Sequence, residues 1–292
     1  HTEIAKGGTG FIVVGATSPD GKTGRSTVTC RVVDDDKYIR GFARLADGMH
    51  RYGAKCAVQL QHPGRQAALP REGKFTSTDM AINLPWSQSR AIVYANADES
   101  KKTVHVLSTD EGIELVDRFS EAAWRTMQAG FDAVEILCGT GYLVSAFLSP
   151  ATNQRSDDYG GSVEKRMRFG LDVLRAVRAA VGVEFPIIVR VNGNDFMPNG
   201  IGRKTMREFV RQLEQNGADA FCVNVGWHES RVPQIQTKVP RGVFAYLARG
   251  IRECVNVPVI ASHRINDPAI AREMLADGSC DMVAMGRSLI AD

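Results

Sequence analysis

The sequence of 292 residues lacks several features that would mark common classes of protein. No stretch approaches the roughly 20 apolar residues needed to cross a bilayer, and the opening HTEIAKGGTG has no apolar core typical of a signal peptide. Neither sign of charge dominates, because 36 Lys and Arg stand against 33 Asp and Glu. A nucleic-acid footprint is therefore not expected. We predict a cytoplasmic protein whose partners include neither membrane nor nucleic acid.

Cysteine patterns and glycine-rich loops are missing as well. No two of the six cysteines form a C-x-x-C pair of the kind that binds metal or shuttles electrons, so no metal site is predicted. Their wide spacing favours a reducing compartment. No G-x-G-x-x-G follows any apolar run, which argues against a dinucleotide-binding Rossmann unit. The cysteines are Cys30, Cys56, Cys138, Cys222, Cys254 and Cys280.

Short apolar runs rich in β-branched residues recur along the chain and predict buried parallel strands. Helical patterns lie between them. Ser108 and Glu111 form a capping box, and Asp267 before Pro268 is typical of a helix start. A third helix is predicted to open at Thr205 and end near Gly217. The predicted strands are 11–16, 54–60, 131–136, 186–191, 219–224, 257–261 and 281–286.

Alternation of strands and helices indicates either a doubly wound sheet or a (β/α)₈ barrel. Without a Rossmann glycine pattern we favour the barrel, as a single α/β domain over 1–292. Seven runs are present where a barrel needs eight, so we expect its first strand upstream of residue 1. A long polar excursion at 66–108 has two open interpretations: a lid in which Trp86 and Tyr94 cover a substrate, or a surface insertion.

Five segments stand out along the chain: QLQHPGR (59–65), GYLVSAFLSPATNQRSDDYGG (141–161), RMRF (166–169), ASHRINDP (261–268) and DMVAMGRSLIAD (281–292). With these segments the sequence resembles the Old Yellow Enzyme family of FMN-dependent oxidoreductases, and the resemblance spans the whole chain. Within that family, GWHESRVPQIQTKVPRGVFAYL (226–247) is most similar to the 2,4-dienoyl-CoA reductase and enoate reductase branch. The family's usual carbonyl-binding pair is replaced here by Leu137 and Thr140, as it is in that branch.

The resemblance implies contacts to a flavin ring from three positions. Gln59 would bind the pyrimidine edge, and the backbone at Ala16 would contact the ring. Arg190 would face N1 and the C2 carbonyl, where positive charge stabilises reduced flavin. Alternatives stay open, since a glutamine at a strand end is often solvated and Arg190 in an apolar run could belong to a structural ion pair.

A phosphate site is expected from the loops after the last two predicted strands, where barrels of this class commonly bind phosphate. Arg264 follows one strand, and Gly286 with Arg287 follows the other. Glycine allows backbone N–H groups to approach the phosphate, and arginine supplies a fork of donors. His263 either touches the ribityl phosphate or fills space.

Tyr142 and His228 are the predicted catalytic pair. Each follows a predicted strand, and barrel enzymes place catalytic groups at the carboxyl ends of strands. A phenol carries its proton at neutral pH and can donate it, while an imidazole stabilises the tyrosinate or polarises a carbonyl. The resemblance implies this same role for a Tyr and His pair. Packing roles for both residues are the alternative.

These observations lead to three hypotheses of function. The first is an FMN-dependent reductase of activated C=C bonds in enoyl-, dienoyl- or aryl-CoA thioesters or enoates. The second is a flavin-dependent amine dehydrogenase or N-demethylase of the same clan, and the third is a non-catalytic barrel without flavin. The resembling reductases also use NAD(P)H, FAD and a [4Fe–4S] cluster bound beyond the barrel. The sequence leaves the acyl group open, and a homo-oligomer is compatible with it.

Overall fold

The computed structural model describes residues 1–27, 29–67, 74–76, 104–232 and 234–291. Its main element is a parallel eight-stranded sheet in the order β10-β9-β8-β7-β6-β3-β1-β2. Trp86, Tyr94 and most of the 66–108 excursion lie outside the described residues. The strands are β1 (Phe11–Ser18), β2 (Arg31–Val32), β3 (Lys55–Leu60), β6 (Ala133–Cys138), β7 (Ile187–Asn192), β8 (Ala220–Asn224), β9 (Val259–Ala261) and β10 (Met282–Val283). A separate parallel pair joins β4 (Lys74–Thr76) to β5 (Val104–Val106).

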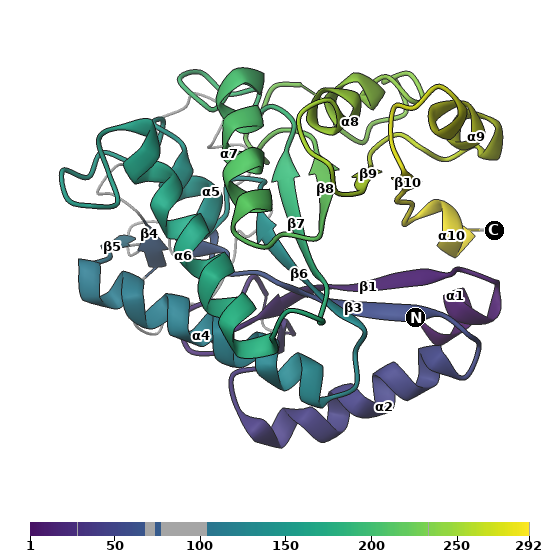
Figure 1. Ribbon diagram of the computed structural model, residues 1–292, viewed down its shortest axis with the longest axis horizontal. Coiled ribbons are helices and arrows are strands. Elements are labelled where there is room, and N and C mark those ends of the chain that lie inside the picture. The colour runs from purple at the N-terminus through teal and green to yellow at the C-terminus, as the bar shows by residue number, and fades with distance from the viewer. Residues whose placement is uncertain (28, 68–73, 77–103, 233, 292) are drawn as a thin grey trace.

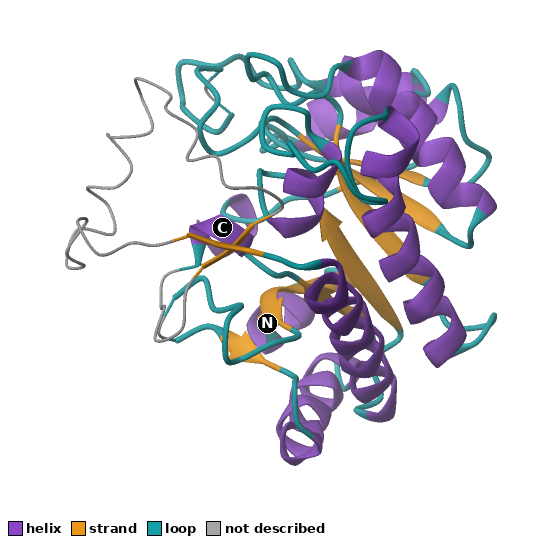
Figure 2. Ribbon diagram, turned by 90° about the vertical axis from the view of Figure 1, so that its left-hand side faces the viewer, coloured by secondary structure: helices purple, strands orange, loops and turns teal. Residues whose placement is uncertain are grey.

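Helices surround the sheet on its outer side, and successive helices follow one another around the molecule (Figure 1, Figure 2). The eight-stranded sheet curls around an interior hollow of about 520 Å³. Every strand of this sheet except β2 contributes residues that line the hollow. This is the (β/α)₈ barrel arrangement predicted from the alternating pattern. The helices are α1 (Thr2–Lys6), α2 (Ile39–His50), α4 (Thr109–Gln128), α5 (Leu143–Leu148), α6 (Val163–Val181), α7 (Arg203–Gln215), α8 (Ala245–Arg252), α9 (Pro268–Ala276) and α10 (Ser288–Ala291).

The predicted local signals are largely confirmed. Ser108 and Glu111 form both hydrogen bonds of the capping box, and the Asp267 side chain caps α9. Helix α7 begins at Arg203, two residues before the predicted Thr205, because the extended Gly202 supplies its N-cap without a side-chain bond. Strand β6 begins and ends two residues later than predicted. The expectation of a further strand upstream stays a prediction.

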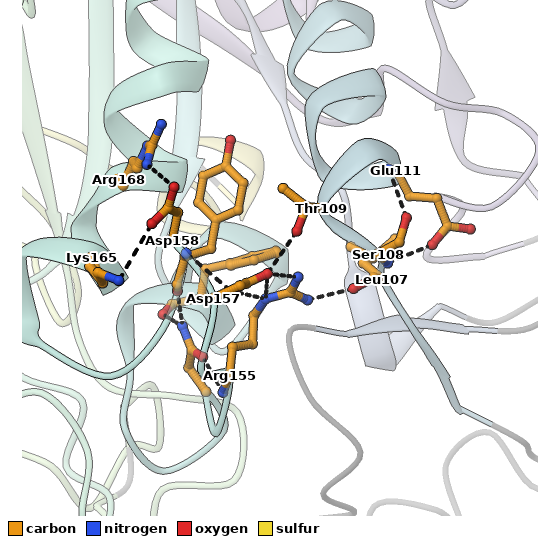
Figure 3. Close-up of polar contacts among 12 residues, drawn as sticks. Leu107, Ser108, Thr109, Glu111, Arg155, Asp157, Asp158, Lys165 and Arg168 are labelled. Carbon is orange, nitrogen blue, oxygen red and sulfur yellow. Dashed lines mark hydrogen bonds and ion pairs between the residues drawn. The ribbon is translucent and has the colours of Figure 1, made fainter.

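Ionic contacts tie the loop before α6 to the start of α4 (Figure 3). The Arg155 guanidinium donates to Asp157 and to the carbonyl of Leu107, and Asp157 accepts from Thr109 Oγ1 at 2.8 Å. Asp158 forms ion pairs with Lys165 and Arg168. The hydrogen bonds from Arg155, acting against partial burial, lower the pKa of Asp157 to about 2. These contacts hold the loop before α6 against the start of α4.

A buried polar cluster braces the loops after β1 and β3. Asp20 accepts from Thr23, and Arg118 Nη1 lies 2.8 Å from the same carboxylate. Thr23 Oγ1 lies 3.2 Å from His62 Nε2. Burial alone would raise the pKa of Asp20, but the bonds from His62, Thr23 and the Lys22 N–H, with the Arg118 charge, hold it well below its usual range.

At the opposite end of the strands, His50, Cys56 and Asp132 place their ligating atoms within 4.8 Å of one another. The carboxylate oxygens of Asp132 already accept from His50, Lys55 and the Cys56 N–H, at 2.7 to 2.8 Å. Burial raises the pKa of the Cys56 thiol to about 12. His50, Cys56 and Asp132 therefore form a hydrogen-bonded structural cluster.

No helix in the described part of the chain has the length and apolarity to cross a membrane.

Candidate functional site

Tyr142 and His228 lie together at the carboxyl ends of β6 and β8. The Tyr142 hydroxyl is 2.9 Å from His228 Nε2, and the ring centroids are 5.1 Å apart with the planes at 63°. Both side chains are half-buried. The two predicted catalytic residues are therefore in hydrogen-bond contact although 86 positions separate them in the sequence. This contact allows a proton to be shared between a phenol and an imidazole.

Backbone contacts between two turns hold the pair in place. Thr140 and Trp227 form a parallel β-bridge, and the His228 N–H donates to the Thr140 carbonyl at 3.4 Å. Between them Gly141 adopts φ +82°, and a Cβ there would lie 2.9 Å from the fully buried Trp227 ring. A residue without a side chain is thus required where the turn crosses the indole.

Arginine side chains line a second hollow of about 550 Å³ at the ends of β9 and β10. Arg190, Arg264 and Arg287 all border it, and none forms a salt bridge within the described ranges. Gly286 borders the same space, and an added Cβ there would meet nothing within 4 Å. A hollow with several guanidinium groups and no paired carboxylate fits an anion such as phosphate.

His263 stands among these cations with its ring neutral. Burial, followed by the charges of Arg190 and Arg287, lowers its pKa to about 4. Its Nδ1 lies 2.8 Å from Ser262 Oγ. Both His263 and Arg264 adopt left-handed backbone angles, with φ of +72° and +56°. Two consecutive non-glycine residues in this region indicate a turn held by its surroundings, which is common where a backbone surrounds a ligand.

Gln59 and Ala16 contact each other at the rim of the barrel interior. The Gln59 carbonyl oxygen accepts from the Ala16 N–H at 3.2 Å, and its amide nitrogen donates to Glu135 at 2.6 Å. Gln59, Glu135 and Arg190 all line the interior hollow. Sequence reasoning proposed Gln59 but did not single out Glu135, a buried carboxylate on the neighbouring strand in register with it. An acid inside an apolar strand was the signal that could have identified it.

Arg190 has neutral partners in place of the ion pair considered as an alternative. Its Nη2 donates to Asn224 Oδ1 at 3.0 Å and its Nη1 to Cys222 Sγ at 3.3 Å. Arg190, Gly286 and the two residues that follow β10, Ala284 and Met285, border both hollows, which therefore meet at this point. Tyr142 and His228 border neither hollow, so the structure places the predicted residues in two groups.

Glu229, next to His228, has hydrogen-bond partners in another loop that the sequence did not predict. Glu229 Oε1 accepts from Arg65 Nη2 at 2.6 Å and from Gln66 Nε2 at 3.0 Å. The Arg65 guanidinium also lies over the Trp227 ring, 5.5 Å from its centroid. The buried carboxylate beside His228 is thus already neutralised by an arginine from another loop.

Comparison with known proteins gives a match over the whole chain. The NADH:flavin oxidoreductase / NADH oxidase family matches residues 1–292. A metal reductase of Desulforamulus reducens is 44% identical over 290 residues, which are 99% of this chain and 41% of that protein. An N,N-dimethylglycine/sarcosine dehydrogenase of Chromohalobacter salexigens is 33% identical over 298 residues, covering all of this chain and 41% of the relative.

Among solved structures, a 2-naphthoyl-CoA reductase in complex with 2-naphthoyl-CoA superposes with a TM-score of 0.91 at 27% identity. The superposed region covers 100% of this chain and 44% of the reductase chain. The chain therefore spans about two-fifths of the length of these similar proteins.

Proposed function

The chain belongs to the NADH:flavin oxidoreductase / NADH oxidase family of flavin-dependent oxidoreductases, and we propose that it reduces activated C=C bonds in enoyl-, dienoyl- or aryl-CoA thioesters or enoates. The observation that carries this proposal is the 2.9 Å contact between the Tyr142 hydroxyl and His228 Nε2. A C=C reduction needs a proton at carbon, and a phenol held by an imidazole at a strand end supplies one.

In this proposal the residues that border the two hollows bind the cofactor, and Tyr142 with His228 supplies the proton. Arg264, Gly286 and Arg287 would hold the phosphate of FMN, and His263, neutral at physiological pH, would leave the positive charge to the arginines. Arg190, Gln59 and the backbone at Ala16 would hold the ring. FMN, when bound and reduced, supplies hydride equivalents. Arg190 raises the positive potential where negative charge develops, which lowers the barrier.

Tyr142 then provides the proton that completes saturation of the double bond. Its hydroxyl is oriented by the ring nitrogen of His228, which stabilises the oxygen as the proton leaves. Leu137 and Thr140 occupy the positions from which the broader family holds a carbonyl. The absence of a donor at Leu137 supports a substrate that is oriented by other groups, as a large thioester would be.

Electrons would reach FMN from NAD(P)H, through FAD and a [4Fe–4S] cluster bound outside this barrel. The similarity to a 2-naphthoyl-CoA reductase supports an acyl-CoA substrate. Oxidation of an amine is the second candidate, supported by the similarity to an N,N-dimethylglycine/sarcosine dehydrogenase. Arg65 pairs with one oxygen of Glu229, which weakens the attraction of this carboxylate for a cationic amine, although Oε2 has no hydrogen-bond partner among the described residues.

Anaerobic reoxidation tests the proposal without the natural electron donor. The FMN-loaded protein is photoreduced and mixed with crotonyl-CoA, a dienoyl-CoA, 2-naphthoyl-CoA or ferric citrate, while recovery of the oxidised flavin band is followed. We expect thioesters to reoxidise the flavin. Reoxidation by ferric citrate alone, or reduction of the oxidised protein by sarcosine, would replace the proposal with another activity.

Tyr142→Phe tests the assignment of the proton donor. It should bind and photoreduce FMN normally and slow reoxidation by the thioester about 10²- to 10⁴-fold, the usual contribution of a general acid. Tyr159→Phe is the matched control, because Tyr159 donates its hydroxyl to Asp172 at 3.1 Å, in the loop and helix away from this pair. Equal rates in the two variants would remove Tyr142 from the proposed role.

A further inference from the structure

Three turns at the carboxyl ends of β6, β7 and β8 are connected through the buried residue Asp195 and its hydrogen-bond partner Asn192. Its carbonyl accepts from the Trp227 N–H at 3.1 Å, which fixes the turn that carries His228. Its carboxylate accepts from Asn192 Nδ2 at 2.7 Å and from the Ile201 N–H at 2.8 Å. Asp195 is 1% exposed, so these groups are not competing with water.

Asn192 continues the connection to the turn that carries Tyr142. Its Oδ1 accepts from the Thr140 N–H at 3.1 Å and from Asn224 Nδ2 at 3.4 Å. Asn224, in register with Asn192 on the next strand, accepts in turn from Arg190. A series of hydrogen bonds thus runs from Arg190, at the hollow lined by arginines, through Asn224 and Asn192 to Asp195. A branch at Asn192 reaches Thr140, in the turn that carries Tyr142.

The donors at the two ends of this chain determine which side chains fit between them. Thr140 and Ile201 both present backbone N–H groups, so positions 192 and 195 must offer an acceptor to each and still bond to each other. One amide and one carboxylate satisfy all three contacts. Two amides leave two donors facing each other in every orientation, and two ionised carboxylates leave two acceptors facing.

We propose that Asp195 is a positioning residue for the proton donor: with Asn192 it fixes the Thr140 and Trp227 turns so that the Tyr142 hydroxyl meets His228. This inference rests on the function proposed above and assigns no contact with substrate to Asp195. Because misplacement of a reacting group by about 1 Å can cost about 10²-fold, loosening either turn slows proton donation.

These hydrogen bonds fit the ionised form of Asp195, because both of its carboxylate oxygens accept. Burial raises the pKa of Asp195 to about 6, although the hydrogen bonds from Asn192 and Ile201 act in the opposite direction. The Trp227 indole also faces the group and lowers the pKa without a hydrogen bond of normal geometry. Across the described ranges, no charged side chain contributes to this shift. Asp195 is therefore mainly ionised above pH 7 and loses that form as the pH falls below about 6.

Four proteins test the proposal: the unsubstituted chain, Asp195→Asn, Asn192→Asp and the exchanged double variant Asn192→Asp/Asp195→Asn. The exchanged variant keeps every hydrogen bond with the carboxylate moved to position 192. We expect Asp195→Asn to bind and photoreduce FMN normally but to be reoxidised by the thioester at least about tenfold more slowly. We expect the exchanged variant to return to within about threefold of the unsubstituted rate.

Asn192→Asp adds a readout that simple loss of packing would not give. Its two facing carboxyl groups can be satisfied only while they share a proton, so its reoxidation rate should rise as the pH is lowered. The unsubstituted protein should lose rate over the same fall in pH through about 6. An exchanged variant as slow as Asp195→Asn, or equal pH profiles for Asn192→Asp and the unsubstituted protein, would overturn the proposal.

A readout independent of turnover separates this inference from the proposed function. In protein with isotope-labelled histidine, the NMR signal of the His228 ring, assigned with His228→Gln, reports its hydrogen bond to Tyr142. Asp195→Asn should shift that signal and the exchange should restore it, whether or not thioesters are substrates. If no thioester reoxidises the unsubstituted protein, the function fails while this signal still decides the role of Asp195.

Discussion

Replacing Gly141 with alanine tests how tightly the site is constrained. A residue with a side chain at φ +82° carries a cost of about 1–2 kcal/mol in the left-handed region. The added Cβ would also lie 2.9 Å from the Trp227 ring, and overpacking of a rigid buried group costs about 1–3 kcal/mol. Together these lower the free energy of unfolding by about 2–5 kcal/mol. Because His228 follows Trp227, proton donation should also slow by about tenfold or more.

Gly130→Ala is the matched control for this prediction. Gly130 has φ +80°, and its added Cβ would meet nothing within 4 Å. Gly130→Ala should therefore lose only the unfolding free energy that the left-handed backbone conformation costs a residue with a side chain. Urea denaturation of both variants, with FMN absent, gives the steric cost by difference. Equal losses of unfolding free energy in the two variants would refute the claim that the indole restricts position 141.

Three other predictions concern the hollow bordered by Arg190, Arg264 and Arg287, stability in acid, and the access of a reagent to a buried thiol. Arg287→Ala should weaken FMN binding about 10- to 150-fold, measured by quenching of flavin fluorescence, because a charge-assisted hydrogen bond is worth about 1.5–3 kcal/mol. Asp20→Asn should cost stability at pH 7, and the difference should shrink as the pH falls below about 4, because a lowered folded-state pKa stabilises only above the unfolded value. Cys222, whose pKa burial raises to about 12, should resist a thiol reagent in the folded protein and react after unfolding in urea, as mass spectrometry of labelled peptides would show.

The strands and their carboxyl-end residues could be predicted because apolar runs and turns are local signals. Tyr142 and His228 each follow such a run, and the parallel arrangement brings both to one edge. The partners of Arg190 and Gln59 could not be predicted, since they depend on which residue of the neighbouring strand lies in register. Asp195 was missed for a related reason: its importance comes from three turns that meet in space, and nothing in NGNDF (192–196) marks it.

The hollow bordered by Arg190, Arg264 and Arg287 has a consequence for handling the protein. Like charges held together without a counter-ion repel, so the flavin-free protein should be unusually responsive to the salt that surrounds it. Sulfate or inorganic phosphate would occupy the space and stabilise the folded chain by mass action, whereas chloride at equal ionic strength would only screen. The choice of buffer anion thus decides how much protein survives removal of the flavin.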